Sequence, residues 1–100
     1  MSWATEYISR LQRGETVQFR PRGGSMTGII ESGQLVTVAP VAPADVRPRD
    51  VVLCTVAGAQ YLHLVRDVRN GRAQIANNRG YINGWTDLCH VYGKLIAAED

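Results

Sequence analysis

A serine that follows two glycines is a residue of this chain that could act as a nucleophile. Ser25 follows Gly23 and Gly24 and precedes Met26. A serine in such a turn can expose its hydroxyl while nearby backbone N–H groups stay free, and free donors of this kind stabilise an oxyanion. The same composition also fits a flexible loop that contains a serine. A catalytic role for Ser25 therefore depends on whether the chain supplies a base.

The base that a serine nucleophile needs is a neutral histidine, or a lysine kept neutral by burial. The chain contains two histidines, His63 and His90. His63 falls in a run that alternates like a β-strand, with Tyr61 and Val65 on the same face. A packed, hydrogen-bonded histidine is the alternative interpretation of this position. We predict that His63 is the base for Ser25.

A third residue would hold the imidazole of His63 in the correct tautomer. The Asn-Gly pair at positions 70 and 71 predicts a two-residue hairpin turn. Pairing outward from that turn places Asn78 opposite His63, on the same side of the sheet. A register shifted by one residue brings Asn77 to that position instead.

Two cysteines, Cys54 and Cys89, are the other reactive side chains, and we expect reduced thiols. A turn at positions 58 and 59 would place Cys54 opposite His63. That arrangement leaves a thiolate–imidazole pair as an alternative to a buried, hydrophobic cysteine. The spacings C-x-x-C and H-x-x-x-H do not occur, and if Cys89 and His90 lie on a strand they point to opposite faces and do not share one ion. We therefore expect no metal and no cofactor.

The elements that must position these residues are mostly short strands. Apolar residues at helical spacing predict an N-terminal helix over residues 2–13, which Ser2 can cap and Gly14 can end. Beyond it the pattern has a period of two, which predicts a β-rich body over residues 15–96. We expect strands over 16–20, 34–40, 50–57, 60–68, 72–78 and 91–96, a surface connection over 41–49, and a loop or turn over 81–85. The predicted fold class is mainly β: a single domain with a small coiled or barrel-like sheet and one N-terminal helix.

Composition narrows the class of protein. One hundred residues, 45% hydrophobic and 20% charged, are typical of one folded domain. A net charge of +2 is too small for a strong electrostatic hold on nucleic acid, so we interpret the arginines as solvated surface, among them Arg10, Arg13, Arg20 and Arg22. The chain has neither an apolar run of the roughly 18 residues that cross a membrane nor an apolar leader. We expect a cytoplasmic protein without a membrane span.

Several short motifs, taken in order, resemble the signal peptidase and LexA-like superfamily of serine peptidases. The family patterns are S-M-x-P, then G-D-x-V-x-V, then G-D-V-V, then a strand that bears the base, and a final G-K-V/I strand. The resemblance covers roughly residues 19–96 and implies a sheet of this family's type, with Ser25 as the nucleophile. The matching segments are Gly24-Ser25-Met26, Ser32 to Val38, Arg49-Asp50-Val51-Val52, His63-Leu64-Val65 and Val91 to Leu95.

The chain departs from these patterns at several positions. His63 stands where bacterial members carry a lysine, as in the branch of the family found in archaea and the endoplasmic reticulum. Thr27-Gly28 replaces the x-P after Ser-Met, and Gln34 replaces the aspartate of the first G-D pair. The stretch over residues 75–80 lacks the acid that assists the histidine in that branch. The candidates for the third residue are therefore Asn78, Asn77 and Asp87.

From the residues and the resemblance together we predict a free-standing serine endopeptidase domain with a Ser25–His63 dyad. The loop that contains Gly23, Gly24 and Met26 would hold the oxyanion and contact the substrate. A peptide or protein substrate would bind in extended form along an open strand edge. The alternative is a catalytically inactive peptidase scaffold that binds a peptide or regulates a partner. Apolar strand edges leave a homodimer open.

Overall fold

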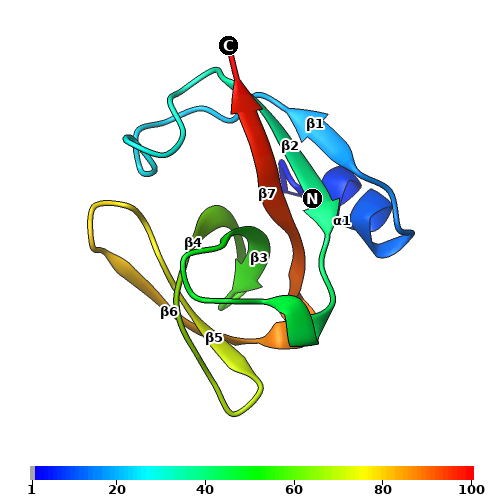
Figure 1. Cartoon of the computed structure of the whole chain (residues 1–100), viewed down its shortest axis with the longest axis vertical. Coiled ribbons are helices and arrows are strands. Elements are labelled where there is room, and N and C mark those ends of the chain that lie inside the picture. The colour runs from blue at the N-terminus through cyan, green and yellow to red at the C-terminus, as the bar shows by residue number, and fades with distance from the viewer. Residues whose placement is uncertain (1) are drawn as a thin grey trace.

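The computed structural model describes residues 2–100. Within this range the chain forms one antiparallel sheet of seven strands in the order β1-β2-β7-β3-β4-β5-β6 (Figure 1). The strands are β1 (Val17–Phe19), β2 (Leu35–Pro40), β3 (Val51–Val56), β4 (Ala59–Arg69), β5 (Arg72–Ala76), β6 (Ile82–Asp87) and β7 (Val91–Glu99). One helix, α1 (Thr5–Gln12), precedes them, and two short 3-10 turns, η1 (Pro43–Asp45) and η2 (Leu88–His90), connect strands. The prediction of a mainly β fold with one N-terminal helix is confirmed.

The sheet is open, with β1 and β6 at its two edges, and it is strongly coiled. Strand β6 curls back toward β3, because the Thr86 hydroxyl donates a hydrogen bond to the Thr55 carbonyl oxygen at 2.7 Å. Thr86 is buried by this contact. The half of the sheet made by β4, β5 and β6 therefore wraps around β3 instead of extending flat (Figure 1).

Helix α1 covers one face of the sheet through an apolar stripe whose buried member is Leu11. The helix begins at Thr5, later than predicted, because the Ser2 hydroxyl accepts the N–H of Ala4 (3.2 Å) in the turn before the helix. Gly14 follows the helix with a φ of +87° and donates its N–H to the Leu11 carbonyl oxygen. Over residues 2–100, no helix has the length and apolar character needed to cross a membrane.

Strand β3 lies at the centre of the fold and is buried on both faces. Its alternating side chains divide between two apolar clusters, as the period of two requires. Leu53 packs in the cluster beneath α1, with Val17, Val36 and Val38. Val52 packs in the cluster on the opposite face; its other buried members are Val46, Cys54, Val56, Val65, Ala73, Ile75 and Val91.

Strand β7 lies between β2 and β3 in the sheet (Figure 1), and Gly93 of β7 is closely packed by its neighbours. A Cβ atom at Gly93 would lie 2.7 Å from the Ala39 carbonyl oxygen and 2.9 Å from a methyl carbon of Leu11. Real Cβ atoms do not come so near to neighbouring atoms. The absence of a side chain at Gly93 therefore lets α1, β2 and β7 pack together.

The Asn70-Gly71 hairpin forms as predicted. Both residues have positive φ, 51° and 74°, and Arg69 faces Arg72 across the turn. A bulge between Val65 and Asp67 then shifts the register by one residue. The expected pairing of His63 with Asn78 rested on an unbroken ladder and is wrong.

Two other local predictions are also wrong. The turn between β3 and β4 uses Ala57 and Gly58 rather than residues 58 and 59, so Cys54 lies opposite Tyr61 and Val52 lies opposite His63. The segment expected as a loop over residues 81–85 belongs largely to β6. It pairs with β5 through a second irregularity, and Gly84 has a φ of +133° there.

Candidate active site

The loop between β1 and β2 presents Ser25 at the surface. Its two ends are tied together, because the Gly33 N–H donates to the Pro21 carbonyl oxygen at 2.8 Å. Met26 and Ile30 are buried beneath the loop and join the apolar cluster under α1. Ser25 itself is exposed. The loop is thus anchored on its inner side and offers the serine hydroxyl on its outer side.

The connection between β5 and β6 holds this loop from the other side (Figure 1). The N–H of Asn78 donates to the Ser25 carbonyl oxygen at 2.9 Å. The Asn78 side-chain amide donates to the Thr27 carbonyl oxygen at 2.8 Å. Two hydrogen bonds from a single asparagine therefore fix the backbone immediately around the serine.

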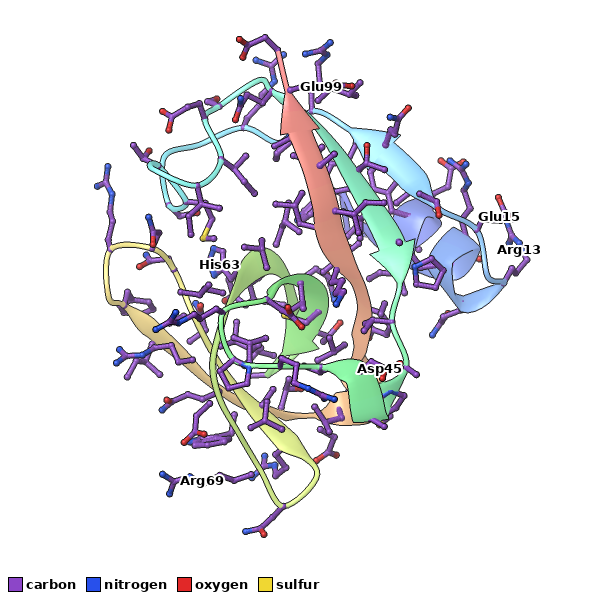
Figure 2. The ribbon with its side chains drawn as sticks, viewed as in Figure 1. Arg13, Glu15, Asp45, His63, Arg69 and Glu99 are labelled. Atoms are coloured by element: carbon purple, nitrogen blue, oxygen red, sulfur yellow. The ribbon has the colours of Figure 1, made fainter. Side chains whose placement is uncertain are left out.

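The Ser25 hydroxyl meets the imidazole of His63. Ser25 Oγ lies 3.1 Å from His63 Nε2, a hydrogen-bond distance, although the residues are 38 positions apart. His63 is in β4 and is only 8% exposed, and its ring lies 4.9 Å from the Tyr61 ring on the same face of the strand. Figure 2 shows His63 in the region between the β1–β2 loop and the β5–β6 connection. The predicted encounter of Ser25 with His63 is present in the fold.

The second imidazole nitrogen of His63 is paired with Asn83. His63 Nδ1 lies 2.7 Å from the side-chain oxygen Oδ1 of Asn83. An amide oxygen only accepts hydrogen bonds, so Nδ1 carries the proton and Nε2 is left as an acceptor. The lone pair of Nε2 therefore faces the hydroxyl of Ser25.

Burial lowers the pKa of His63 from its ordinary value of 6.5, because a charged imidazole loses hydration in this environment. The hydrogen bond to Asn83 acts in the opposite direction and raises the pKa, but it is the smaller effect. The net result favours the neutral imidazole at neutral pH. A neutral imidazole is the form that can accept a proton from Ser25.

The residues that we expected to orient His63 have other partners. Asn78 binds the serine loop, as described above. The side-chain oxygen of Asn77 accepts the N–H groups of Arg79 and Tyr81 and so shapes the β5–β6 connection. Asp87 forms an exposed ion pair with Arg72 at 3.3 Å. Asn83 takes the expected position because β6 continues through a segment that we had predicted to be a loop.

Sequence reasoning missed Asn83 because it lies between Ile82 and Gly84, in a stretch rich in turn-forming residues. A signal was nevertheless present. The isoleucine before it, and Trp85 and Thr86 after it, are types common in strands.

The predicted oxyanion loop divides into two parts. The N–H of Gly23 is used, because it donates to the hydroxyl of Ser32 at 3.2 Å. Among residues 2–100 no acceptor is found for the N–H groups of Gly24, Ser25 or Met26. These three donors belong to Ser25 and its two neighbours in sequence.

The family that the chain resembles has proline at the position of Gly28. The backbone conformation at Gly28 explains why a glycine, and not a proline, stands here. Gly28 has a φ of +99°, whereas proline is fixed near –65°. A Cβ atom at this residue would also lie 3.1 Å from the side-chain nitrogen of Asn78. The N–H of Gly28 donates to the Glu31 carboxylate at 2.9 Å, a bond that proline could not form. Glycine therefore allows the loop to dock against Asn78.

In the described residues neither cysteine forms a hydrogen bond with Ser25 or His63. Cys54 is buried in the cluster opposite α1, and burial raises the pKa of its thiol to about 12. A thiolate at Cys54 is therefore disfavoured, and the thiolate–imidazole alternative is not supported. Cys89 is exposed in η2.

Cys89 and His90 do not lie on a strand but in the 3-10 turn η2, so the argument that a strand would separate them does not apply. Ligand atoms of Asp87, Cys89 and His90 lie within 4.8 Å of one another. All three side chains are exposed, and the carboxylate of Asp87 is already paired with Arg72. We assign no role to this cluster.

A cleft of about 460 Å³ opens beside Ser25 and His63. It runs from these two residues along the start of β4 and reaches α1 and β1. The serine loop forms one wall and the segment Gln60 to His63 forms another. A cleft of this size falls within the range of small-molecule and peptide side-chain sites.

Comparisons of the chain with protein-family models, with curated proteins and with solved structures found no match. What defines this protein is therefore its fold and its site: a coiled, mainly β domain in which a serine, a histidine and an asparagine form one hydrogen-bonded series beside a cleft.

Proposed function

We propose that this protein is a serine peptidase that hydrolyses a peptide bond with Ser25 as nucleophile and His63 as general base. The observation that carries the proposal is the continuous series Ser25 Oγ, His63 Nε2, His63 Nδ1 and Asn83 Oδ1, with spacings of 3.1 and 2.7 Å at its two hydrogen bonds. In this series Asn83 is a positioning residue that acts through His63. A nucleophile, a base and an orienting residue are the parts that acyl transfer requires.

The chemistry proceeds in two halves. Ser25 Oγ attacks the carbonyl carbon of the peptide while its proton passes to His63 Nε2. The tetrahedral intermediate collapses when the C–N bond breaks, and the same proton leaves on the amine product. Water then attacks the acyl ester, gives its proton to His63, and releases the acid product while Ser25 recovers its hydrogen.

The negative charge that develops on the carbonyl oxygen would be stabilised by the serine loop. The N–H groups of Gly24, Ser25 and Met26 are the candidate donors, since they belong to the nucleophile and its sequence neighbours and have no acceptor in the described chain. Met26 is buried and Asn78 holds the Ser25 carbonyl group, so the loop is fixed before substrate arrives. Donors held in advance stabilise a transition state more than mobile ones do.

An extended peptide has a strand edge available beside the nucleophile. Strand β4 pairs with β5 only from Leu64 onward. In the described chain the first half of β4 therefore has no hydrogen-bonded strand on the edge that faces away from β3. Val65 directs its N–H and C=O toward residues 49 and 50 on the β3 side. Because direction alternates along a strand, Gln60 and Leu62 direct theirs to the open side. A substrate strand pairing there would lie next to Ser25 and His63.

The lack of charge on Asn83, the third residue of the series, affects the rate of hydrolysis that we expect. Asn83 orients the imidazole but carries no charge, so it stabilises an imidazolium less than a carboxylate does. We therefore expect a slower enzyme than one with an aspartate in this position.

The first test is the reaction of the intact protein with a fluorophosphonate probe, followed by peptide mapping. We expect labelling at Ser25 and a loss of the labelling rate on the order of a hundredfold or more in His63→Ala. His90→Ala is the matched control and keeps the rate of the unmodified protein, since His90 lies in η2 and takes no part in the series.

The second test is hydrolysis of a mixed peptide library by the unmodified protein and by Ser25→Ala, read by mass spectrometry. Cleavage that disappears in Ser25→Ala supports the peptidase. A folded protein that neither reacts with the probe nor cleaves any peptide would overturn the proposal in favour of an inactive scaffold that binds peptides.

A further inference from the structure

The far end of the cleft is walled by aromatic rings. Phe19 of β1 stacks on Tyr7 of α1, with ring centroids 4.5 Å apart, and the Trp3 ring lies 5.7 Å from the Phe19 ring in a tilted arrangement. All three residues line the cleft together with Ser25 and His63. Trp3 remains 52% exposed. An exposed tryptophan in the same cleft as a nucleophile is a surface on which a ligand side chain can be buried.

We propose that this cleft selects peptide substrates that carry a bulky apolar side chain, an aromatic one above all, next to an acidic residue. The inference rests on the proposed function, since it names the substrate class of the same site. The bulky side chain packs on Trp3, Tyr7 and Phe19. The acidic residue pairs with Arg20 and Arg22, which also line the cleft.

The size of the cleft favours a large side chain. Its volume of about 460 Å³ far exceeds what an alanine methyl group fills. A small side chain would leave the exposed ring of Trp3 in contact with water. An aromatic side chain would remove that apolar surface from water and add ring–ring contacts, and both effects stabilise the complex.

The charges around the cleft favour an acidic neighbour. Arg20 and Arg22 line it, and no carboxylate in residues 2–100 forms an ion pair with either. Arg20 also donates to the Gly33 carbonyl oxygen at 2.8 Å, which holds its guanidinium in place. The one acidic residue in the lining, Glu31, accepts the N–H of Gly28. The balance of charge is positive, which complements a carboxylate.

The strand edge provides the geometry that joins these contacts to the reaction. Gln60, Tyr61 and Leu62 line the same cleft and precede His63 on β4. A peptide paired with this edge extends from Ser25 toward α1, at a rise of about 3.3 Å per residue. Side chains on one side of that peptide therefore reach the aromatic wall while its carbonyl group stays at Ser25.

Peptide binding to the intact Ser25→Ala protein tests the cleft independently of cleavage. Four fluorescent peptides of equal length are compared by anisotropy: one with Phe beside Glu, one with Ala beside Glu, one with Phe beside Gln, and one with Ala beside Gln. We expect the Phe-Glu peptide to bind about tenfold more tightly than either single replacement. Equal affinity for the four peptides would overturn the proposal, whatever the variants below show.

Two substitutions then assign the contacts. In the Ser25→Ala background, Trp3→Ala should weaken binding of the Phe peptides about tenfold and leave the Ala peptides unchanged. Trp85→Ala is the matched control, since Trp85 lies on β6 and does not line this cleft. Arg22→Gln should weaken binding of the Glu peptides and reduce their salt dependence, with no effect on the Gln peptides. A Trp3→Ala protein that keeps its preference for Phe would contradict the assignment.

The two proposals fail in distinguishable ways. If the unmodified protein is not labelled at Ser25 but the cleft binds the Phe-Glu peptide selectively, the peptidase proposal is refuted and the cleft is retained as a peptide-binding site. Labelling at Ser25 without selectivity among the four peptides would retain the nucleophile and refute the substrate class.

Discussion

His63 Nδ1 lies 2.7 Å from Asn83 Oδ1, and this contact joins the central half of the sheet to the edge strand β6. The two residues are 20 positions apart and come together because β5 and β6 fold back along β4. The contact decides which nitrogen of His63 faces Ser25. The chemistry of the site therefore depends on the edge strand β6. Asn83 acts on this chemistry through His63, without a hydrogen bond of its own to Ser25 or to the serine loop.

Replacing Asn83 tests the orienting contact. In Asn83→Ala the Nδ1 proton loses its acceptor, so we expect the rate of probe labelling at Ser25 to fall on the order of tenfold or more. In Asn83→Asp the acceptor is kept and a charge is added, which raises the pKa of His63 and moves the acid limb of the pH–rate profile to higher pH. The measurement is the labelling rate between pH 4 and pH 9.

Asp87→Asn serves as the control for these variants. Asp87 pairs with Arg72 and has no contact with His63, so its loss should leave the pH–rate profile in place. An unchanged profile in Asn83→Asp would show that residue 83 does not act on the imidazole.

The lowered pKa of His63 predicts how stability depends on pH. The unfolded chain takes up a proton near the ordinary pKa of 6.5, whereas the folded chain resists protonation until lower pH. Between these two values the unfolded state binds more protons, so the free energy of unfolding decreases as the pH falls. Above the ordinary pKa both states are neutral at His63, and its contribution does not change with pH.

Denaturant unfolding of the unmodified protein and of His63→Gln between pH 8 and pH 4 measures this effect. We expect the stability difference between the two proteins to be constant above about pH 7 and to shift in favour of His63→Gln at lower pH. A difference that does not vary with pH would mean that burial does not lower the pKa.

The two cysteines should react at very different rates with a thiol reagent. Burial raises the pKa of Cys54 to about 12 and shields its sulfur, whereas Cys89 is exposed. We expect one thiol to react in the native protein and two after denaturation. The native Cys89→Ser protein should show no fast reaction, while Cys54→Ala should keep it. Fast native modification of Cys54 would require the core around β3 to open.

Gly28 and Gly33 form a matched pair in the serine loop, with φ values of +99° and +85°. Alanine at either position adds backbone strain of about 1 kcal/mol. A Cβ atom at residue 28 would also press on the side chain of Asn78, whereas a Cβ atom at residue 33 would have no neighbouring atom within 4 Å. We expect similar small losses of thermal stability, and a marked loss of labelling at Ser25 only in Gly28→Ala. Equal labelling in both variants would show that the Asn78 contact does not position the serine.

Gly93→Ala should be the most destabilising of these substitutions. The new methyl group would overlap the Ala39 carbonyl oxygen and Leu11, where backbone and core both have to shift. Overpacking of this kind costs about 1–3 kcal/mol or more. Gly58→Ala is the control with positive φ but no close neighbour. Chemical denaturation measures both, and a Gly93→Ala protein as stable as the control would contradict the close packing of β7.

The parts of the fold that follow local rules were predictable. The Asn70-Gly71 turn needs two residues with positive φ, and these two residue types supply them. Strand β3 is a mostly apolar run and β4 is rich in residue types common in strands, and both were expected within two residues of their observed ends. The meeting of Ser25 and His63 was predicted from the residue types and from the resemblance.

The register and the third residue were not predictable in the same way. The bulge near Arg66 depends on how β4 bends to follow β3 and β5, and no turn signal marks it. Strand β6 contains Asn83 and Gly84, which alone favour a turn, and it forms because β5 offers an edge to pair with. Tertiary pairing therefore overrides local preference at the residue that orients His63.

The position of β7 gives the chain one further property. The last strand in sequence lies between β2 and β3, and the exposed Asn70-Gly71 turn separates Ser25 and His63 from Asn83 and β7. A cut at that turn would yield a 70-residue piece and a 30-residue piece. The longer piece keeps the pairs β1–β2 and β3–β4 but loses β7, which joins these pairs and is carried by the shorter piece. Neither piece contains the whole site, so recovery of Ser25 reactivity on mixing them would report their recombination. The fold thus has the layout of a split reporter.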